Sequence, residues 1–255
     1  MSVPSSPNFS LSGRRALVTG SSQGIGLALA GALAAAGAHV ILNGRDPAKL
    51  ATAAAKLRAA GNTSVDTAAF DVTDEDAVHS AAASLGAVDI LVNNTGINIR
   101  GPLETATLAD WETVLRTNLT SAFLVARAVA PGMIARRSGK IINICSLMSD
   151  LARPTIAPYA AAKGGLKMLT RSMCAEWARH NIQINGIAPG YILTELTAPL
   201  ADDPKFDSWI KSRTPAGRWG DVADLTGACV FLASPAAGFI NGQIIVVDGG
   251  ISAVI

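Results

Sequence analysis

The chain of 255 residues has little of several residue types that define whole classes of protein. Only 16% of its residues are charged, the net charge is +2, and no Lys/Arg block is longer than two residues. This composition predicts no nucleic-acid partner. Its three cysteines, Cys145, Cys174 and Cys229, lack metal-ligand spacing and suit a reducing cytoplasm. The three histidines form no ligand pattern either, so we expect no metal site.

Long hydrophobic runs are also missing, although 49% of the residues are apolar. No apolar run reaches the roughly 18 residues of a membrane helix, and the first residues lack the order of a secretory signal. Ample apolar residues and a low net charge exclude disorder, and this length allows one large core. We therefore expect a cytoplasmic protein without a membrane partner, with a flexible tail over 1–10 and one catalytic domain over 11–255.

Short β-branched runs alternate with longer Ala- and Leu-rich stretches, and they predict seven strands: 15–19, 39–43, 67–71, 89–93, 140–144, 182–185 and 243–247. Apolar strands that alternate with helices indicate a parallel sheet covered on both faces. With right-handed crossovers, the predicted fold class is α/β, a doubly wound (Rossmann) seven-stranded parallel sheet. The stretch at about 191–220 interrupts this pattern irregularly, and we expect it to form a substrate loop.

The first predicted strand runs into a glycine-rich turn, Gly-x-x-x-Gly-x-Gly, at Gly20, Gly24 and Gly26. Glycines let the chain turn tightly and let a pyrophosphate approach the amides of a helix N-terminus. The spacing differs from the Gly-x-Gly-x-x-Gly pattern, but its place after the first strand of a doubly wound sheet predicts a dinucleotide site.

The end of the second predicted strand decides between NAD and NADP. An acidic residue there would bind free ribose hydroxyls and repel a 2′-phosphate. The chain instead has Asn43, Gly44 and Arg45, and its first acid is Asp46. Arginine suits phosphate, so the sequence favours NADP, although Gln23 supplies no second basic contact. The alternative is that Arg45 caps the next helix or lies in solvent.

Tyr159 and Lys163 are four residues apart at the start of a predicted helix and share one of its faces. A phenol has an ordinary pKa of about 10, and a neighbouring ammonium lowers that pKa. Ser146 follows the strand at 140–144, at the edge where such sheets bind ligands. Asn118 lies inside a predicted helix, where asparagine is unfavourable. The alternatives are a turn cap for Ser146 and a bend for Asn118.

Together these segments resemble the short-chain dehydrogenase/reductase family over about residues 11–251. The matching residues are the glycine turn, Asp71-Val72, Asn93-Asn94-Thr95-Gly96, Asn118, Ser146, Tyr159, Lys163, Pro189-Gly190 and Val247-Asp248-Gly249-Gly250. Thr95 stands where the family usually has alanine.

The resemblance implies a role for each site residue. Tyr159 would be the general acid/base and Ser146 would bind the substrate oxygen. Lys163 would lower the Tyr159 pKa and hold the nicotinamide ribose, and Asn118 would hold a water molecule that connects Lys163 to solvent. The resemblance also implies a homotetramer, whose subunit contacts the apolar stretches 122–125 and 251–255 would form. It implies a cofactor site made of Gly20, Ser22, Gln23, Gly24, Ile25, Gly26, Asn43, Arg45, Asp71, Val72, Asn94, Gly96, Tyr159, Lys163, Pro189, Gly190, Ile192 and Thr194.

Segments around the expected pocket, 151–154, 187–191 and 211–220, resemble the gluconate 5-dehydrogenase subgroup. That resemblance implies interconversion of D-gluconate and 5-keto-D-gluconate, commonly with NADP. A sugar acid needs a cation for its carboxylate, and Arg153 and Arg100 are the candidates for substrate binding beside Ser146 and Tyr159. The alternative for both arginines is a surface ion pair with Asp150 or Glu104, or a contact with a neighbouring subunit.

Three other functions remain open at this stage. The apolar residues near the pocket suit a broad-scope NADPH-dependent carbonyl reductase of bulky ketones. A reductase of ketones bound to acyl carrier protein needs a basic docking patch, for which Arg136-Arg137 is the candidate. A non-catalytic dinucleotide-binding protein has no need of the Ser146, Tyr159, Lys163 and Asn118 set.

Overall fold

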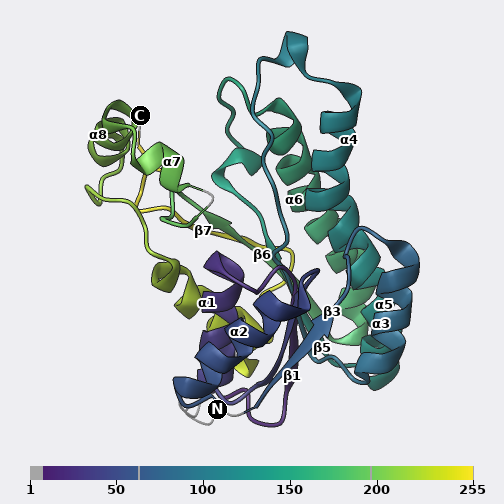
Figure 1. Ribbon diagram of the computed structural model, residues 1–255. Coiled ribbons are helices and arrows are strands. Elements are labelled where there is room, and N and C mark those ends of the chain that lie inside the picture. Colours follow the sequence, from purple (N-terminus) through teal and green to yellow (C-terminus); the bar gives the residue numbers. More distant parts are fainter. Residues whose placement is uncertain (1–7, 63, 196, 255) are drawn as a thin grey trace.

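The computed structural model describes residues 8–62, 64–195 and 197–254. They form a seven-stranded, all-parallel sheet with the strand order β3-β2-β1-β4-β5-β6-β7 (Figure 1). The strands are β1 (Arg15–Val18), β2 (His39–Gly44), β3 (Val65–Ala69), β4 (Ile90–Asn93), β5 (Gly139–Ile144), β6 (Ile182–Pro189) and β7 (Ile244–Val247). The order reverses between β1 and β4, where doubly wound sheets bind ligands. The predicted fold class is confirmed.

Helices cover both faces of the sheet, as Figure 1 shows. One face carries α1 (Gly24–Ala35), α2 (Pro47–Ala59) and α9 (Thr226–Ala233), and the other carries α3 (Glu75–Leu85), α5 (Ser121–Arg136) and α6 (Ala157–Trp177). Neighbouring strand residues point to opposite faces. Ala16 and Val18 therefore join one apolar cluster, and Leu17 joins the other. This two-sided burial accounts for the high apolar content.

The longest helical segment, Leu108–Arg136, consists of α4 (Leu108–Leu115), a π-turn labelled η2 (Arg116–Thr120) and α5. By length and composition alone it could cross a membrane, but half of its most apolar window is buried inside the fold. Such burial is that of a core helix. The other short turns are η1 (Leu103–Thr105), η3 (Leu147–Ser149), η4 (Ala178–His180), η5 (Val222–Leu225) and η6 (Pro235–Ala237).

The stretch at about 191–220, which the sequence predicts to be irregular, contains two helices, while its role as a substrate loop stays a prediction. They are α7 (Ala198–Ala201) and α8 (Pro204–Arg213). The Asp203 carboxylate accepts a 3.0 Å hydrogen bond from the Lys205 N–H, and Pro204 occupies the first position of α8. Both features favour a helix start. In Figure 1, α7 and α8 form a lobe beyond the carboxyl ends of β6 and β7.

Candidate active site

The glycine turn between β1 and α1 is shaped for an anion. Gly20 and Gly24 have φ angles of +59° and +56°, a region that favours glycine. A Cβ on Gly26 would lie 2.4 Å from the carbonyl oxygen of Gly20, so only glycine fits there. No acidic residue lies in the first turn of α1, which leaves its N-terminal amides open to a negative group.

Two asparagine side chains, one buried and one half-buried, form hydrogen bonds with the backbone of this turn. Asn94 donates hydrogen bonds of 3.0 and 2.9 Å to the carbonyl oxygens of Thr19 and Gly20. Asn43 accepts one from the Gly20 N–H at 3.4 Å, and its amide donates to the carbonyl oxygens of Ala68 and Phe70. Asn43 is only 1% exposed. Its side chain therefore joins the turn to β3.

Arg45 lies at the carboxyl end of β2 with its side chain 81% exposed. Asp46 caps α2 by accepting hydrogen bonds from the N–H groups of Ala48 and Lys49, so Arg45 is not the cap. The Arg45 guanidinium lies 3.8 Å from the Asp71 carboxylate, and such exposed pairs contribute about 0–1 kcal/mol. Ser22 Oγ lies 3.8 Å from the position of a Cβ on Gly44. Arg45 and Ser22 thus provide available donors beside the turn.

The Asp71 carboxylate is held ionised by its surroundings. Burial opposes ionisation, but hydrogen bonds from the Thr73 N–H and hydroxyl outweigh it, and Arg45 and Arg116 add to them, so the pKa of Asp71 is lowered. Both Thr73 bonds measure 2.8 Å. Val72, the next residue, is buried in the apolar core, so only its backbone can meet a cofactor.

Lys163 and Tyr159 meet at the carboxyl end of β5. The Lys163 side chain is buried, and its Nζ donates a 2.7 Å hydrogen bond to the carbonyl oxygen of Ile144. The same nitrogen lies 5.7 Å from the centre of the Tyr159 ring. A cation beside a phenol stabilises negative charge on the phenol oxygen. The predicted proximity of the two side chains is confirmed by this distance.

Asn118 is buried in the π-turn η2, and π-turns often lie at functional sites. Its amide donates to the carbonyl oxygens of Val114 and Ile97 at 2.8 and 2.9 Å, and its Oδ1 accepts from the Ile97 N–H. A Cβ on Gly96 would lie 2.7 Å from Asn118 Oδ1 and 3.6 Å from Lys163 Nζ. Gly96, Asn118 and Lys163 are therefore brought together, and Asn118 also stabilises the bend.

Ser146 begins the η3 turn, and its hydroxyl oxygen accepts a 3.1 Å hydrogen bond from the Met148 N–H. Because that bond uses a lone pair, the hydroxyl proton stays free to donate. Ser149 supports this geometry: its oxygen accepts from the Ser146 N–H at 3.3 Å, and its hydroxyl donates to the Lys163 carbonyl oxygen at 2.9 Å. Ser149 is a site residue that the sequence does not single out, because its only signal there is its spacing of three from Ser146.

Arg100 and Arg153 lie on two loops that are joined by a 3.1 Å hydrogen bond from the Gly101 N–H to the Thr155 carbonyl oxygen. Burial lowers the pKa of Arg100, Arg153 lowers it further, and Tyr191 opposes them. Within the ranges given above, neither arginine forms an ion pair. Asp150, the expected surface partner of Arg153, pairs with Lys167 instead.

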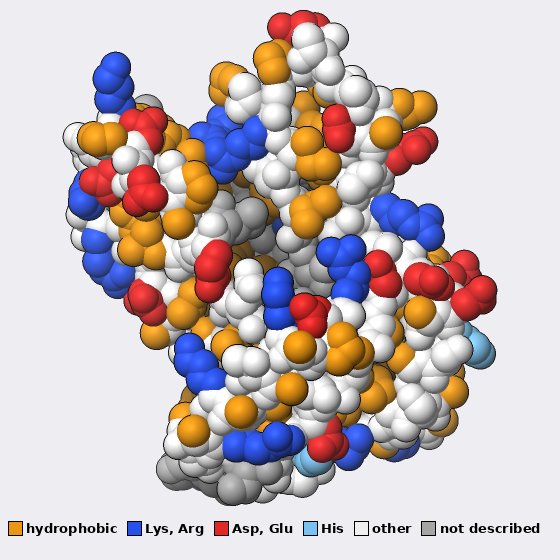
Figure 2. Space-filling model, in the orientation of Figure 1, with side chains coloured by type: hydrophobic (Ala, Val, Ile, Leu, Met, Phe, Trp, Pro, Cys, Tyr) orange, Lys and Arg blue, Asp and Glu red, His pale blue; other side chains and the backbone are white. Residues whose placement is uncertain are grey.

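Tyr191 is a further residue of this region that sequence analysis did not select. Burial raises its pKa, while Arg153 and Arg100 oppose that rise and Tyr159 adds to it. Phe206 links Tyr191 to Arg153: the rings of Tyr191 and Phe206 are 5.7 Å apart, and Arg153 Cζ lies 5.2 Å from the centre of the Phe206 ring. Figure 2 shows basic side chains at the edge of the hollow between the α7/α8 lobe and the ridge of α4 and α6.

The remaining predicted cofactor residues lie around the carboxyl end of β6 and the start of α1. Pro189 ends β6, and a Cβ on Gly190 would lie 2.7 Å from the Cα of Asp248. Ile192 is buried and pairs with Gly220. Three others are placed by the same elements: Gln23 at the N-cap of α1, Ile25 in its first turn, and Thr194 beside Thr197, whose hydroxyl accepts from the Thr194 N–H at 2.9 Å.

A carboxylate approaches the glycine turn from the segment after β6. Glu195 is exposed, and its Oε2 lies 3.4 Å from the position of a Cβ on Gly24. A negative group at the N-terminus of α1 competes with a phosphate for the same amides. A dinucleotide at this turn would therefore meet the Glu195 carboxylate as a competing negative group.

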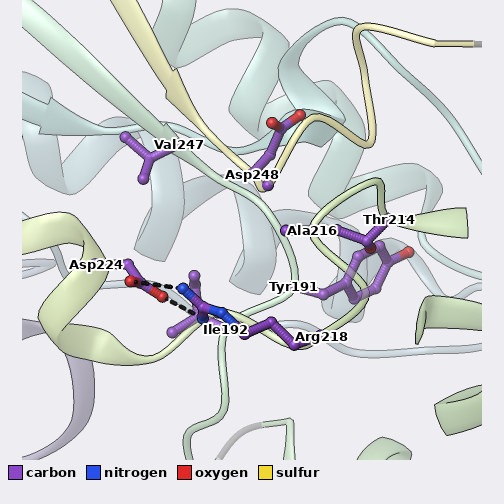
Figure 3. A pocket seen from close by; sticks show the side chains of 10 residues that line it. Tyr191, Ile192, Thr214, Ala216, Arg218, Asp224, Val247 and Asp248 are labelled. Carbon is purple, nitrogen blue, oxygen red and sulfur yellow. Dashed lines mark hydrogen bonds and ion pairs between the residues drawn. The ribbon is translucent and has the colours of Figure 1, made fainter.

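A cavity of about 210 Å³ lies behind Tyr191 and Ile192, with Thr214 and Asp248 on other walls (Figure 3). Its one cation, Arg218, is neutralised, because the guanidinium donates hydrogen bonds of 2.7 and 3.0 Å to the two oxygens of Asp224. The cavity does not include Ser146, Tyr159 or Lys163. No group of three His, Cys, Asp or Glu side chains suited to a metal ion occurs in the described part of the chain.

The fold and site define a dinucleotide-binding oxidoreductase. A family model described as enoyl-(acyl carrier protein) reductase matches residues 20–252. The chain is 54% identical over 248 residues to a gluconate 5-dehydrogenase of Gluconobacter oxydans, with 96% of each chain covered. It is 48% identical over 246 residues to a 5-keto-D-gluconate 5-reductase of Escherichia coli K12, covering 95% of this chain and 96% of that one.

Solved structures give the same result. A gluconate 5-dehydrogenase from Burkholderia cenocepacia in complex with NADP and tartrate has a TM-score of 0.94 and 54% identity, and the match covers 98% of this chain and 99% of that one. The chain belongs to the short-chain dehydrogenase/reductase family and is an oxidoreductase that acts on CH–OH groups. The predicted family is confirmed.

Proposed function

We propose that the protein is an NADP-dependent gluconate 5-dehydrogenase that interconverts D-gluconate and 5-keto-D-gluconate. The observation that carries this proposal is the pair of arginines, Arg100 and Arg153, whose loops are joined by the Gly101–Thr155 hydrogen bond and whose charges, like that of Tyr159, act on the Tyr191 phenol. Two cations without acidic partners suit a substrate that carries a carboxylate. The two relatives named for gluconate and 5-ketogluconate support the same substrate class.

The glycine turn fits the pyrophosphate of NADP, because Gly20 and Gly24 adopt the left-handed backbone conformation of a tight turn and the first turn of α1 carries no acidic residue beside its free amides. Arg45 and Ser22 would hold the 2′-phosphate, and an exposed guanidinium can make a bidentate contact with it. Lys163, with Asn94 and Gly96 nearby, would hold the nicotinamide ribose. The complex of the Burkholderia cenocepacia protein with NADP supports this preference.

When bound, the nicotinamide exchanges a hydride with the reacting carbon. In the reductive direction, the Tyr159 hydroxyl gives its proton to the substrate oxygen, and Ser146 donates a hydrogen bond to the same oxygen. Lys163 Nζ stabilises the negative charge that develops on the Tyr159 oxygen. Asn118 would hold the water through which Tyr159 is reprotonated. In the oxidative direction each proton moves the opposite way.

The alternative functions have weaker support. The Arg136-Arg137 patch expected to dock an acyl carrier protein is engaged in internal contacts: Arg136 donates to the Val88 carbonyl oxygen, and Arg137 donates to that of Arg179. A carbonyl reductase of bulky ketones gives no role to Arg100 and Arg153, which form no ion pair within the described residues and act on Tyr191. A non-catalytic binding protein gives no role to the buried Lys163.

We also propose a cytoplasmic homotetramer. Of the apolar stretch expected at the subunit contact, Phe123 is 40% exposed, while Ala122, Leu124 and Val125 are buried within the chain. Met168 on α6 is 55% exposed. The free apolar side chains of α5 and α6 therefore support one contact, and the exposed Val254 near the C-terminus supports a second. Ile255, also expected at this contact, lies outside the described residues.

The proposal is tested by NADPH consumption with 5-keto-D-gluconate, with an uncharged ketose of similar size, and with a set of aryl ketones. We expect kcat/KM for 5-ketogluconate to exceed that for the uncharged ketose by at least tenfold, because only the acid can engage the arginines. Faster turnover of aryl ketones than of 5-ketogluconate would refute the proposal in favour of the carbonyl reductase.

A further inference from the structure

Tyr191 lies at a fixed point beside the proposed substrate site. It follows Pro189-Gly190 at the carboxyl end of β6, where Gly190 packs directly on Asp248. Its carbonyl oxygen accepts a 2.9 Å hydrogen bond from the Gly220 N–H. The backbone of Tyr191 is therefore held from two sides, by the C-terminal segment and by the segment after α8.

Three aromatic rings also hold the Tyr191 ring. The ring centres of Phe206, Trp219 and Trp209 lie 5.7, 5.8 and 6.2 Å away, with interplanar angles of 66°, 88° and 88°. Edge-to-face pairs of this kind are favourable. Trp219 is buried, and its Nε1–H donates a 2.8 Å hydrogen bond to Asp207 on α8. The orientation of the Tyr191 ring is thus set by its neighbours.

The Tyr191 hydroxyl, by contrast, has no hydrogen-bond partner among residues 8–62, 64–195 and 197–254. Packing alone would be satisfied by phenylalanine, and the hydroxyl is not one of the buried polar atoms that lack a partner, so it is accessible to water or to a ligand. The charges of Arg153, Arg100 and Tyr159 all act on this phenol, and burial keeps it in its protonated form. A protonated phenol near two guanidinium groups can accept from a cation and donate its own proton to an anion.

We propose that Tyr191 is a specificity-determining residue whose hydroxyl donates a hydrogen bond to the carboxylate end of the substrate, between Arg100 and Arg153. This inference rests on the proposed function and deepens it. The two arginines supply positive charge. Tyr191 supplies a hydrogen-bond donor with a fixed direction, because three neighbouring rings hold its own ring in place. The substrate class that this corner selects is an open-chain hydroxy acid with its carboxylate remote from the reacting carbon.

Phe206 connects this corner to α8. It touches both the ring of Tyr191 and the guanidinium of Arg153, so the helix can hold the two groups in register. A cation over an aromatic face is attracted to the negative face of the ring. Phe206 is accordingly a positioning residue, and any change there acts through Arg153 and Tyr191.

The test compares Tyr191→Phe, which keeps the ring, with Tyr191→Leu, which removes it. For Tyr191→Phe we expect KM for 5-ketogluconate to rise by about tenfold, as for the loss of one hydrogen bond to a charged group. We expect a smaller change in kcat, a KM rise below twofold for an uncharged ketose, and an unchanged melting temperature. Tyr191→Leu should raise both KM values and lower the melting temperature, since the aromatic packing is lost.

An unchanged KM in Tyr191→Phe would overturn the inference, and so would an equal rise for the acid and the ketose. Failure of the proposed function appears separately, in the wild-type protein. If the wild type prefers another sugar acid, the same comparison is made with that acid and its uncharged counterpart, and the same KM split is expected. If it accepts no acid at all, both proposals are wrong.

Discussion

Lys163 Nζ donates a 2.7 Å hydrogen bond to the carbonyl oxygen of Ile144, two residues before Ser146. This bond fastens the first turns of α6 to the end of β5, so Tyr159 and Ser146 are brought to the same edge of the sheet. Ser149 adds a second tie between the two segments. The reacting groups are therefore positioned by the scaffold before any substrate binds.

Replacing Tyr159 with phenylalanine should lower kcat by about 10²–10⁴-fold, the usual contribution of a general acid. The dissociation constant for NADPH, measured by fluorescence titration, should change less than threefold, because the variant keeps the ring and Lys163. Turnover close to that of the wild type would show that another group supplies the proton.

The charge of Arg45 should decide the cofactor preference. Arg45→Asp places an acid where the 2′-phosphate is expected, so we predict a fall of about 100-fold in the kcat/KM ratio of NADPH over NADH. Arg45→Lys keeps the charge but loses the bidentate contact and should give an intermediate ratio. If Arg45→Asp leaves the ratio at the wild-type value, Arg45 does not read the phosphate.

The loss of Arg153 should affect acidic substrates selectively. Arg153→Ala should raise KM for 5-ketogluconate by about 10–100-fold, because a charge-assisted hydrogen bond is lost, and should change KM for an uncharged ketose far less. The exposed Arg171 on α6 provides the matched control, Arg171→Ala, for which both constants should stay at the wild-type values. Equal KM increases for acid and ketose in Arg153→Ala would place Arg153 in a structural role.

Glu195 should oppose NADPH binding, because its carboxylate approaches the N-terminus of α1. Glu195→Gln removes the like charge and should lower the NADPH dissociation constant by roughly two- to fivefold at low salt. The gain should shrink as salt is added, since the carboxylate is exposed. Glu112→Gln, at an exposed site on α4, is the control. If it lowers the NADPH dissociation constant equally, the effect comes from the net charge of the protein and not from the position of Glu195.

Lys140 gives a prediction about stability. Burial lowers its pKa to about 8, with Arg14 adding to the effect, whereas the unfolded chain has a pKa of about 10.4. Below about pH 8 both states are protonated and the folded state bears the full cost of the buried charge. Between about pH 8 and 10.4 only the unfolded state holds the proton, so this contribution to the free energy of unfolding rises with pH.

Lys140→Met should therefore be more stable than the wild type at pH 7. We expect a gain on the order of 1 kcal/mol: the buried charge is removed, but the variant also loses the 3.3 Å hydrogen bond that Lys140 Nζ donates to the Ala237 carbonyl oxygen, and this loss reduces the gain. The gain should shrink as the pH rises from about 8 to 10. Denaturant titrations at several pH values measure it, with the exposed Lys49→Met as the control. A gain that is independent of pH would contradict the assignment.

Much of the fold could be predicted because buried parallel strands leave a clear pattern. The apolar strand β4 was predicted within one residue. The edge strand β3 was displaced by two, because only Val65 of its five residues is buried and the apolar signal is weak. The strand β6 extends to Pro189, beyond its predicted end at 185, since the glycine and alanine near its end carry little β-strand signal.

Site residues could be predicted where chemistry and spacing coincide, as for Tyr159 and Lys163. The π-turn at Asn118 could not be predicted, because its only sequence signal is an asparagine, a residue of low helix propensity, inside a predicted helix. Tyr191 could not be selected from the sequence, because its role depends on rings up to 28 positions away that α8 folds against it. Contacts between residues that are far apart in the sequence leave no local sequence pattern from which they could be predicted.

The rings that fix Tyr191 lie on α8 and just after it, apart from the strands that end at the glycine turn. The rings that orient Tyr191 are thus carried by a piece of chain separate from the glycine turn. A family built in this way can diverge in substrate by exchanging one helix while the hydride-transfer half is inherited intact. For protein engineering, α8 is accordingly the segment to randomise first when a new hydroxy acid is wanted.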